Sequence, residues 1–63
     1  MNERSETINN VMNTACDIYT DTKRSEGGRY NDMQRYLNDM VNYGAITFKE
    51  KCEIAHNIIE TFI

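Results

Sequence analysis

The apolar residues of this chain recur at helical spacing in three segments. The first segment has a single apolar stripe made of Ile8, Val11, Met12, Ala15, Ile18 and Tyr19. The second has a wider stripe made of Tyr30, Met33, Tyr36, Leu37, Met40, Val41 and Tyr43. The third has a stripe made of Phe48, Cys52, Ala55, Ile58, Ile59 and Phe62. Because apolar residues three and four apart share one face of a helix, the pattern predicts helices near residues 5–24, 29–43 and 47–62.

Breaker and capping residues fall between the predicted helices. Gly44 follows the second helix, where a residue without a Cβ is favoured because the backbone turns left-handed. Thr47 and Glu50 have the spacing of a capping box, which starts a helix by satisfying two backbone N–H groups. The segment 25–28 contains two glycines and no apolar residue, so we expect it to be the first interhelical turn. The sequence therefore predicts a C-terminal antiparallel helical hairpin.

A chain of 63 residues has room for one small domain with a single core. We therefore predict an all-α fold, a small three-helix bundle that spans residues 1–63. A core of this size rarely supplies more than about 3–5 kcal/mol of stability, so pairing with another chain would help. In an alternative arrangement, the second and third helices form a hairpin that dimerises, and the first helix packs onto the partner chain. The expected core contains Ile8, Val11, Met12, Ala15, Ile18, Met33, Leu37, Met40, Val41, Phe48, Cys52, Ala55, Ile59 and Phe62.

The charge pattern argues against direct binding of nucleic acid. Ten acidic and seven basic residues give a net charge of -3, and the basic residues are scattered along the chain. Duplex binders usually gather positive charge on one face. No apolar run resembles a signal peptide or reaches the roughly 20 residues of a membrane span. We therefore expect a cytoplasmic protein with free thiols and no membrane contact.

A helix-turn-helix DNA-binding regulator is the main alternative class. The length of the last turn and its glycine suit a motif in which the third predicted helix enters the major groove. Its polar face would then contain Lys49, Glu50, Lys51, Glu53, His56, Asn57 and Glu60. Three carboxylates against two lysines on that face offset most of the attraction to phosphate, so we do not expect this function.

Cys52 and His56 lie four residues apart, a spacing that can hold a metal ion on one turn of a helix. Cys16, with Asp17 or Glu53, would have to complete a zinc site. Structural zinc sites usually bring two cysteines together in a short knuckle, and the chain has none. The single histidine lacks the partner and the pocket that acid–base or nucleophilic catalysis needs. We therefore expect no metal, no cofactor and no enzymatic activity.

The tyrosines are the most informative residues for function. Tyr36 and Tyr43 are seven residues apart on one edge of the second helix, and they exceed what a single core stripe covers. Ile54 likewise lies beside the main stripe of the third helix. We expect these three residues, with the neighbouring Arg35 and Asp39, to form an exposed partner-binding surface, because tyrosine is favoured at interfaces. The alternative is that the tyrosines cover the edge of the bundle and contact nothing else.

No motif identifies a family. In its overall character the chain is short, mildly acidic, glycine-poor and helical, and it lacks catalytic residues. In this it resembles the small proteins that phages and mobile elements use to bind and disable host or defence machinery. The resemblance implies an inhibitor that occludes a host or defence-system protein, and the acidic balance favours a basic partner surface, such as that of a nucleic-acid-handling complex. A helix-turn-helix regulator and a homo-oligomeric structural module, such as a homodimer, are the alternatives.

Overall fold

The computed structural model describes residues 3–23 and 25–62 of the chain. They form three helices, α1 (Glu3–Tyr19), α2 (Glu26–Asn42) and α3 (Phe48–Thr61), and the described residues contain no strand. The predicted all-α fold with three helices is therefore confirmed. The helix predicted over 5–24 ends earlier than expected, and position 24 lies outside the described residues.

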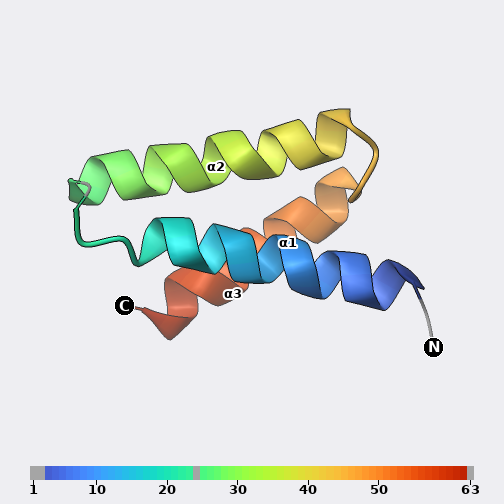
Figure 1. Cartoon of the computed structure of the whole chain (residues 1–63), viewed down its shortest axis with the longest axis horizontal. Helices are drawn as coiled ribbons and strands as arrows, with labels where there is room; N and C mark the ends of the chain where they lie inside the picture. Colours follow the sequence, from blue (N-terminus) through green and yellow to red (C-terminus); the bar gives the residue numbers. More distant parts are fainter. Residues whose placement is uncertain (1–2, 24, 63) are drawn as a thin grey trace.

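The three helices pack into a small bundle in which each helix contacts both others. Figure 1 shows α1 and α2 side by side and running in opposite directions, with α3 crossing behind α1. α2 and α3 also run in opposite directions, so the predicted C-terminal hairpin is confirmed. The start of α1 and the α2–α3 turn lie at one end of the bundle, and the end of α3 and the α1–α2 turn lie at the other.

The connection between α1 and α2 differs from the prediction. α1 ends at Tyr19, and the Thr20 hydroxyl then donates a hydrogen bond to the Cys16 carbonyl oxygen at 2.9 Å. The Asp21 carboxylate accepts the Lys23 backbone N–H at 3.0 Å, which forms an Asx turn. Short polar side chains of this kind compete for backbone groups that a continuing helix would bond. The turn therefore precedes the two glycines and does not contain them.

Ser25 caps the start of α2, and both glycines of the predicted linker lie inside the first turn of this helix. The Ser25 hydroxyl oxygen accepts the backbone N–H of Gly28 at 3.1 Å. A Cβ added to Gly28 would lie 2.9 Å from that oxygen, so a larger residue would displace the cap. The predicted turn over residues 25–28 is wrong, because Ser25 is the N-cap of α2 and the two glycines follow it within the helix.

The α2–α3 turn has the features that the sequence predicts. Gly44 has a φ of +81°, the left-handed conformation that glycine adopts without a steric cost. The Thr47 hydroxyl oxygen accepts the Glu50 backbone N–H at 3.1 Å, and the Glu50 carboxylate accepts the Thr47 backbone N–H at 2.7 Å. This capping box begins α3 at Phe48. The left-handed glycine and the capping box are therefore confirmed.

The Glu50 carboxylate also connects the start of α3 to the start of α1. Its Oε1 atom accepts hydrogen bonds from the Thr47 backbone N–H and from the Arg4 guanidinium, which forms an ion pair with it. The hydrogen bond from the Thr47 backbone lowers the pKa of Glu50 below its usual value of 4.5, and the Arg4 charge adds to this effect while burial opposes it. The fold therefore favours the ionised carboxylate.

Acid should weaken this end of the bundle. Because the pKa of Glu50 is lower in the folded state, the unfolded chain binds the proton more readily. The stability that the carboxylate contributes is present above its unfolded pKa of 4.5 and is lost as the pH falls through the folded pKa. We expect Glu50→Gln to lower the melting temperature at neutral pH and to converge with the wild type in acid, as measured by circular dichroism.

The control for this pH dependence is Glu53→Gln, which removes an exposed carboxylate from the same helix and leaves the capping box intact. A difference between Glu50→Gln and the wild type that stays constant from neutral to acidic pH would contradict the role assigned to the Glu50 charge.

The core lies where the three helices meet. Among the described residues it consists of Val11, Ala15, Met33, Leu37, Ile46, Ile54, Ala55 and Ile58. Several other predicted core residues are half-buried and pack against it, namely Ile8, Met12, Ile18, Met40, Val41 and Ile59. The core residues predicted from α1 and α2 are therefore largely confirmed. α3 buries a different set of residues from the predicted one.

α3 turns a different face to the core from the one that the sequence predicts. Ile54 and Ile58 are buried, whereas Phe48 is 65% exposed, Phe62 is 48% exposed and Cys52 is exposed. The predicted core positions Phe48, Cys52 and Phe62 are therefore wrong. Burial of Ile54 and Ile58 sets the side of α3 that faces α1 and α2, and the ion pair between Glu50 and Arg4 lies on the same side. Positions 54 and 58 follow Glu50 at intervals of four residues, so they continue along that side and reach the core.

Candidate functional site

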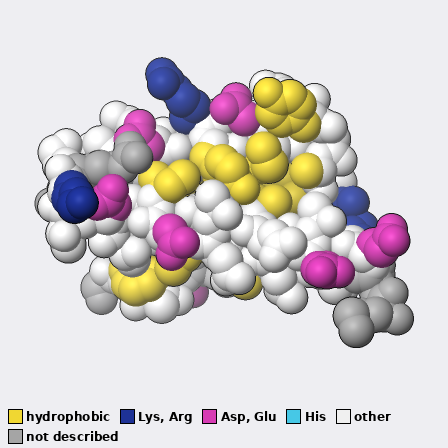
Figure 2. Space-filling model, viewed as in Figure 1, with side chains coloured by type: hydrophobic (Ala, Val, Ile, Leu, Met, Phe, Trp, Pro, Cys, Tyr) yellow, Lys and Arg dark blue, Asp and Glu magenta, His cyan; other side chains and the backbone are white. Residues whose placement is uncertain are grey.

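Three exposed residues lie in a row along the outer side of α2. Arg35, Asp39 and Tyr43 are spaced four residues apart, so their side chains follow one another along one side of the helix. All three are exposed, and Tyr43 is 81% exposed. Figure 2 shows apolar side chains gathered where α1 and α2 meet, with charged side chains along the outer edge of α2. We call Arg35, Asp39 and Tyr43 the α2 row.

Tyr43 holds a fixed position at the end of α2. It is the C-cap residue, and its backbone N–H donates a hydrogen bond to the Asp39 carbonyl oxygen at 2.9 Å. Gly44 then turns the chain towards α3, which leaves the Tyr43 ring in solvent. A tyrosine in such a position offers a large apolar area, few rotatable bonds and a hydroxyl group. The α2 row therefore combines an aromatic contact with two opposite charges.

The other predicted members of this surface lie elsewhere. Tyr36 is half-buried and packs against the core. Ile54 is only 3% exposed, because it lies on the side of α3 that packs into the core. The predicted exposed patch of Tyr36, Tyr43 and Ile54 is therefore wrong, and of these three residues only Tyr43 is fully exposed.

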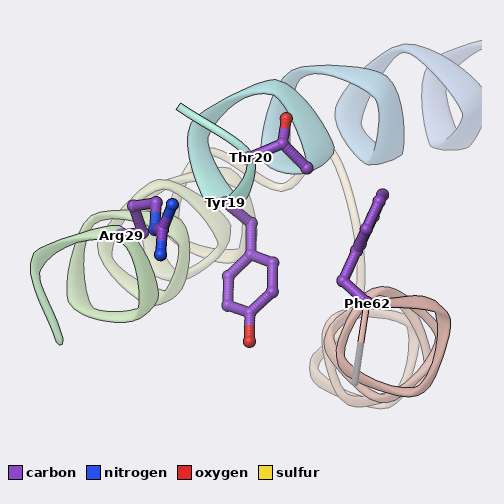
Figure 3. Close-up of a pocket in the computed structure, with 4 residues that line it drawn as sticks. All are labelled: Tyr19, Thr20, Arg29 and Phe62. Carbon is purple, nitrogen blue, oxygen red and sulfur yellow. The ribbon is translucent and has the colours of Figure 1, made fainter. Parts of the chain in front are cut away.

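A hollow lies at the other end of the bundle. Its volume is about 260 Å³, and it is lined by Tyr19, Thr20, Arg29 and Phe62. Figure 3 shows the Tyr19 ring between the Arg29 side chain and the Phe62 ring, and the centres of the two rings are 6.3 Å apart. Pockets that bind small molecules usually measure about 300–1,000 Å³ and enclose most of the ligand. This hollow falls below that range, so we assign no ligand to it.

The residues considered for zinc binding do not form a cluster. Cys16 is half-buried on α1, Cys52 is exposed on α3, and both are free thiols. The His56 Nε2 atom lies 3.0 Å from the carboxylate of Glu60, one turn further along the helix. Among residues 3–23 and 25–62, no group of three or more histidine, cysteine, aspartate or glutamate residues is placed to hold a metal ion.

The polar face of α3 has mixed charge. Lys49, Glu53 and Glu60 are all exposed on it. The Lys51 ammonium lies 5.2 Å from the centre of the Phe48 ring, a cation–π contact within the helix. A helix that reads DNA needs net positive charge to displace counterions from phosphate. This face therefore gives a helix-turn-helix function no support.

No helix in the described part of the chain combines the length and the apolar character needed to cross a membrane. The chain matches no protein-family model, no curated protein and no solved structure. Its function has to be inferred from the surfaces that the fold exposes.

Proposed function

We propose that this chain is a small non-enzymatic binding protein that regulates or inhibits another protein by occluding a site on it. The α2 row is the proposed contact surface. The exposure of Tyr43 at a fixed helix end carries the proposal, because an aromatic ring held in water gains most when a partner covers it. Arg35 and Asp39 beside it would orient the partner through charged hydrogen bonds.

Charge favours a basic partner. The chain has a net charge of -3, so it would be attracted to a positively charged protein surface, which raises the rate of association. Proteins that handle nucleic acid commonly have such surfaces. A cytoplasmic inhibitor of a host or defence-system protein, encoded by a phage or a mobile element, is therefore the setting that we propose for this chain.

Tyr43→Ser is expected to weaken partner binding by at least about 30-fold, because truncating a central aromatic contact costs about 2 kcal/mol or more. Tagged wild type and Y43S would be used for affinity capture from a bacterial lysate, with and without nuclease. The captured protein would be identified by mass spectrometry, and its affinity for both chains would then be measured with purified components.

Tyr30→Ser is the matched control for this experiment. Tyr30 lies on the same helix and is 43% exposed, but it is outside the α2 row. Both variants should keep the helicity of the wild type, whereas Tyr36→Ser is unsuitable because Tyr36 packs against the core. Equal binding by Y43S and the wild type would overturn the proposed contact surface. Capture that disappears with nuclease would instead favour the helix-turn-helix alternative.

A further inference from the structure

Two hollows adjoin at the end of the bundle where α3 ends. The first is the hollow of about 260 Å³ beside Tyr19 and Arg29, which Figure 3 shows. The second measures about 180 Å³ and is lined by residues of α1 and α3. Phe62 lines both, so the two hollows meet at this side chain. Each alone is smaller than the roughly 300 Å³ of a typical small-molecule pocket, but the two together exceed that volume.

The two hollows differ in chemical character. The apolar side chains that line the second are Met12, Cys16, Ile58 and Phe62, and its other lining residues are exposed and polar. The first hollow contains the positive charge of Arg29. Sites that bind small molecules usually combine a mostly apolar lining with a few polar groups that fix the orientation of the ligand. Together, the hollows therefore offer an apolar end and a cationic end.

The Arg29 side chain is available to bind an anion. Arg29 is half-buried near the start of α2, and its guanidinium forms no hydrogen bond or ion pair with residues 3–23 or 25–62. A guanidinium presents its N–H groups in a planar fork that matches the two oxygens of a carboxylate. One arginine balances one negative charge, and the chain has a net charge of -3. A single carboxylate therefore suits the site better than a doubly charged phosphate ester.

Phe62 separates the two hollows and lies at the surface. It is the C-cap residue of α3 and is 48% exposed, and its ring centre is 6.3 Å from that of Tyr19. Exposed side chains change rotamer within about picoseconds to nanoseconds. An outward turn of this ring would give up its contact with Tyr19 and join the hollows. An apolar group that enters the joined space would replace that contact.

We propose that the two hollows together bind an amphipathic monocarboxylate, a molecule with one carboxylate and an apolar tail. The carboxylate binds the Arg29 guanidinium, and the tail lies between α1 and α3 against Met12 and Ile58. For a ligand of about ten non-hydrogen atoms, we expect a dissociation constant of about 0.1–1 mM. The site is separate from the α2 row, whose Tyr43 lies at the opposite end of α2.

Octanoate is the probe for this site, titrated into the full chain while NMR signals are recorded. The Arg29 Nε–H signal and the Met12 methyl signal should both shift and should saturate with one dissociation constant, because one molecule spans both hollows. The Met40 methyl signal should stay in place, since Met40 lies on α2 and lines neither hollow. Methyl octanoate lacks the charge and acetate lacks the tail, so each should bind at least about tenfold more weakly.

Arg29→Gln should weaken octanoate binding at least about tenfold, because it removes hydrogen bonds between charged groups. Lys49→Gln is the matched control, since it removes the same charge from an exposed position near the start of α3, at the other end of the bundle. Both variants should keep the helicity of the wild type. Tyr43→Ser should bind octanoate as the wild type does, so failure of this site and failure of the α2 row are distinguishable.

Three results would overturn the proposal. If only one of the Arg29 and Met12 signals saturated, no single molecule would span the two hollows. Shifts that grow linearly in all methyl signals would show unspecific association with the apolar surface. Equal affinity of R29Q and the wild type for octanoate would show that the guanidinium does not bind the carboxylate.

Discussion

Leu37→Ala is expected to unfold much of the protein at room temperature. Leu37 is fully buried in the middle of α2, where the three helices meet. Replacing a buried leucine with alanine costs about 2–5 kcal/mol, because it removes apolar contacts and leaves a cavity. A single core in so small a chain rarely supplies more than about 3–5 kcal/mol in total. Urea unfolding followed by circular dichroism measures the loss.

Asn38→Ala is the control for the Leu37 variant. Asn38 is the next residue of the same helix and is exposed, so its replacement should change the free energy of unfolding by no more than about 0.5 kcal/mol. If L37A unfolded at the same urea concentration as N38A, the burial of Leu37 between the three helices would be wrong.

A comparison of Ile54→Ala with Phe48→Ala tests the rotation of α3. Ile54 is 3% exposed and Phe48 is 65% exposed, although the heptad pattern of the sequence suggests the opposite. We expect I54A to lower the free energy of unfolding by about 2–5 kcal/mol. F48A should cost less than about 1 kcal/mol, since it removes mainly an exposed ring and its contact with Lys51.

Both α3 variants should be measured at the same low protein concentration as the wild type. If F48A lowered the free energy of unfolding as much as I54A or more, the heptad position Phe48 would face the core. The rotation of α3 described above would then be wrong.

Local features of the fold could be predicted because neighbouring residues decide them. Gly44 determines the left-handed end of α2, and the Thr47–Glu50 box determines the start of α3. The end of α1 was misplaced although its cause is also local. The hydroxyl of Thr20 and the carboxylate of Asp21 bond nearby backbone groups, and these bonds outweigh the helical pattern that continues past Tyr19.

The rotation of α3 could not be predicted, because it depends on which side of the helix α1 and α2 cover, and those helices are distant from α3 in the sequence. The ion pair between Arg4 and Glu50, 46 residues apart, lies on the side of α3 that faces α1, and no spacing within α3 reveals it. Helical periodicity does not say which side of a wide apolar arc meets the core, so the pattern alone places Ile54 at the surface and Phe48 in the interior. Ile46 was missed for a different reason, since it precedes the helix and belongs to no periodic stripe.

The candidate surface could be predicted in part. Tyr43 follows the last turn of α2 and precedes the glycine at which the chain turns towards α3, and it is exposed as expected. Tyr36 lies closer to the buried positions of the same helix and is half-buried. Spacing alone places both tyrosines on one edge, but only the packing of α1 and α2 decides how far that edge is covered.

We expect the two ends of the bundle to differ in the free energy needed to open them locally. At one end, the capping box and the ion pair between Arg4 and Glu50 join two helix starts. At the other end, α2 begins with two glycines held by the single cap of Ser25, so its first turn should open at a lower free energy. Tyr43 lies at the first of these ends. A partner that binds there meets an ordered backbone, so little backbone conformational entropy should be lost on binding.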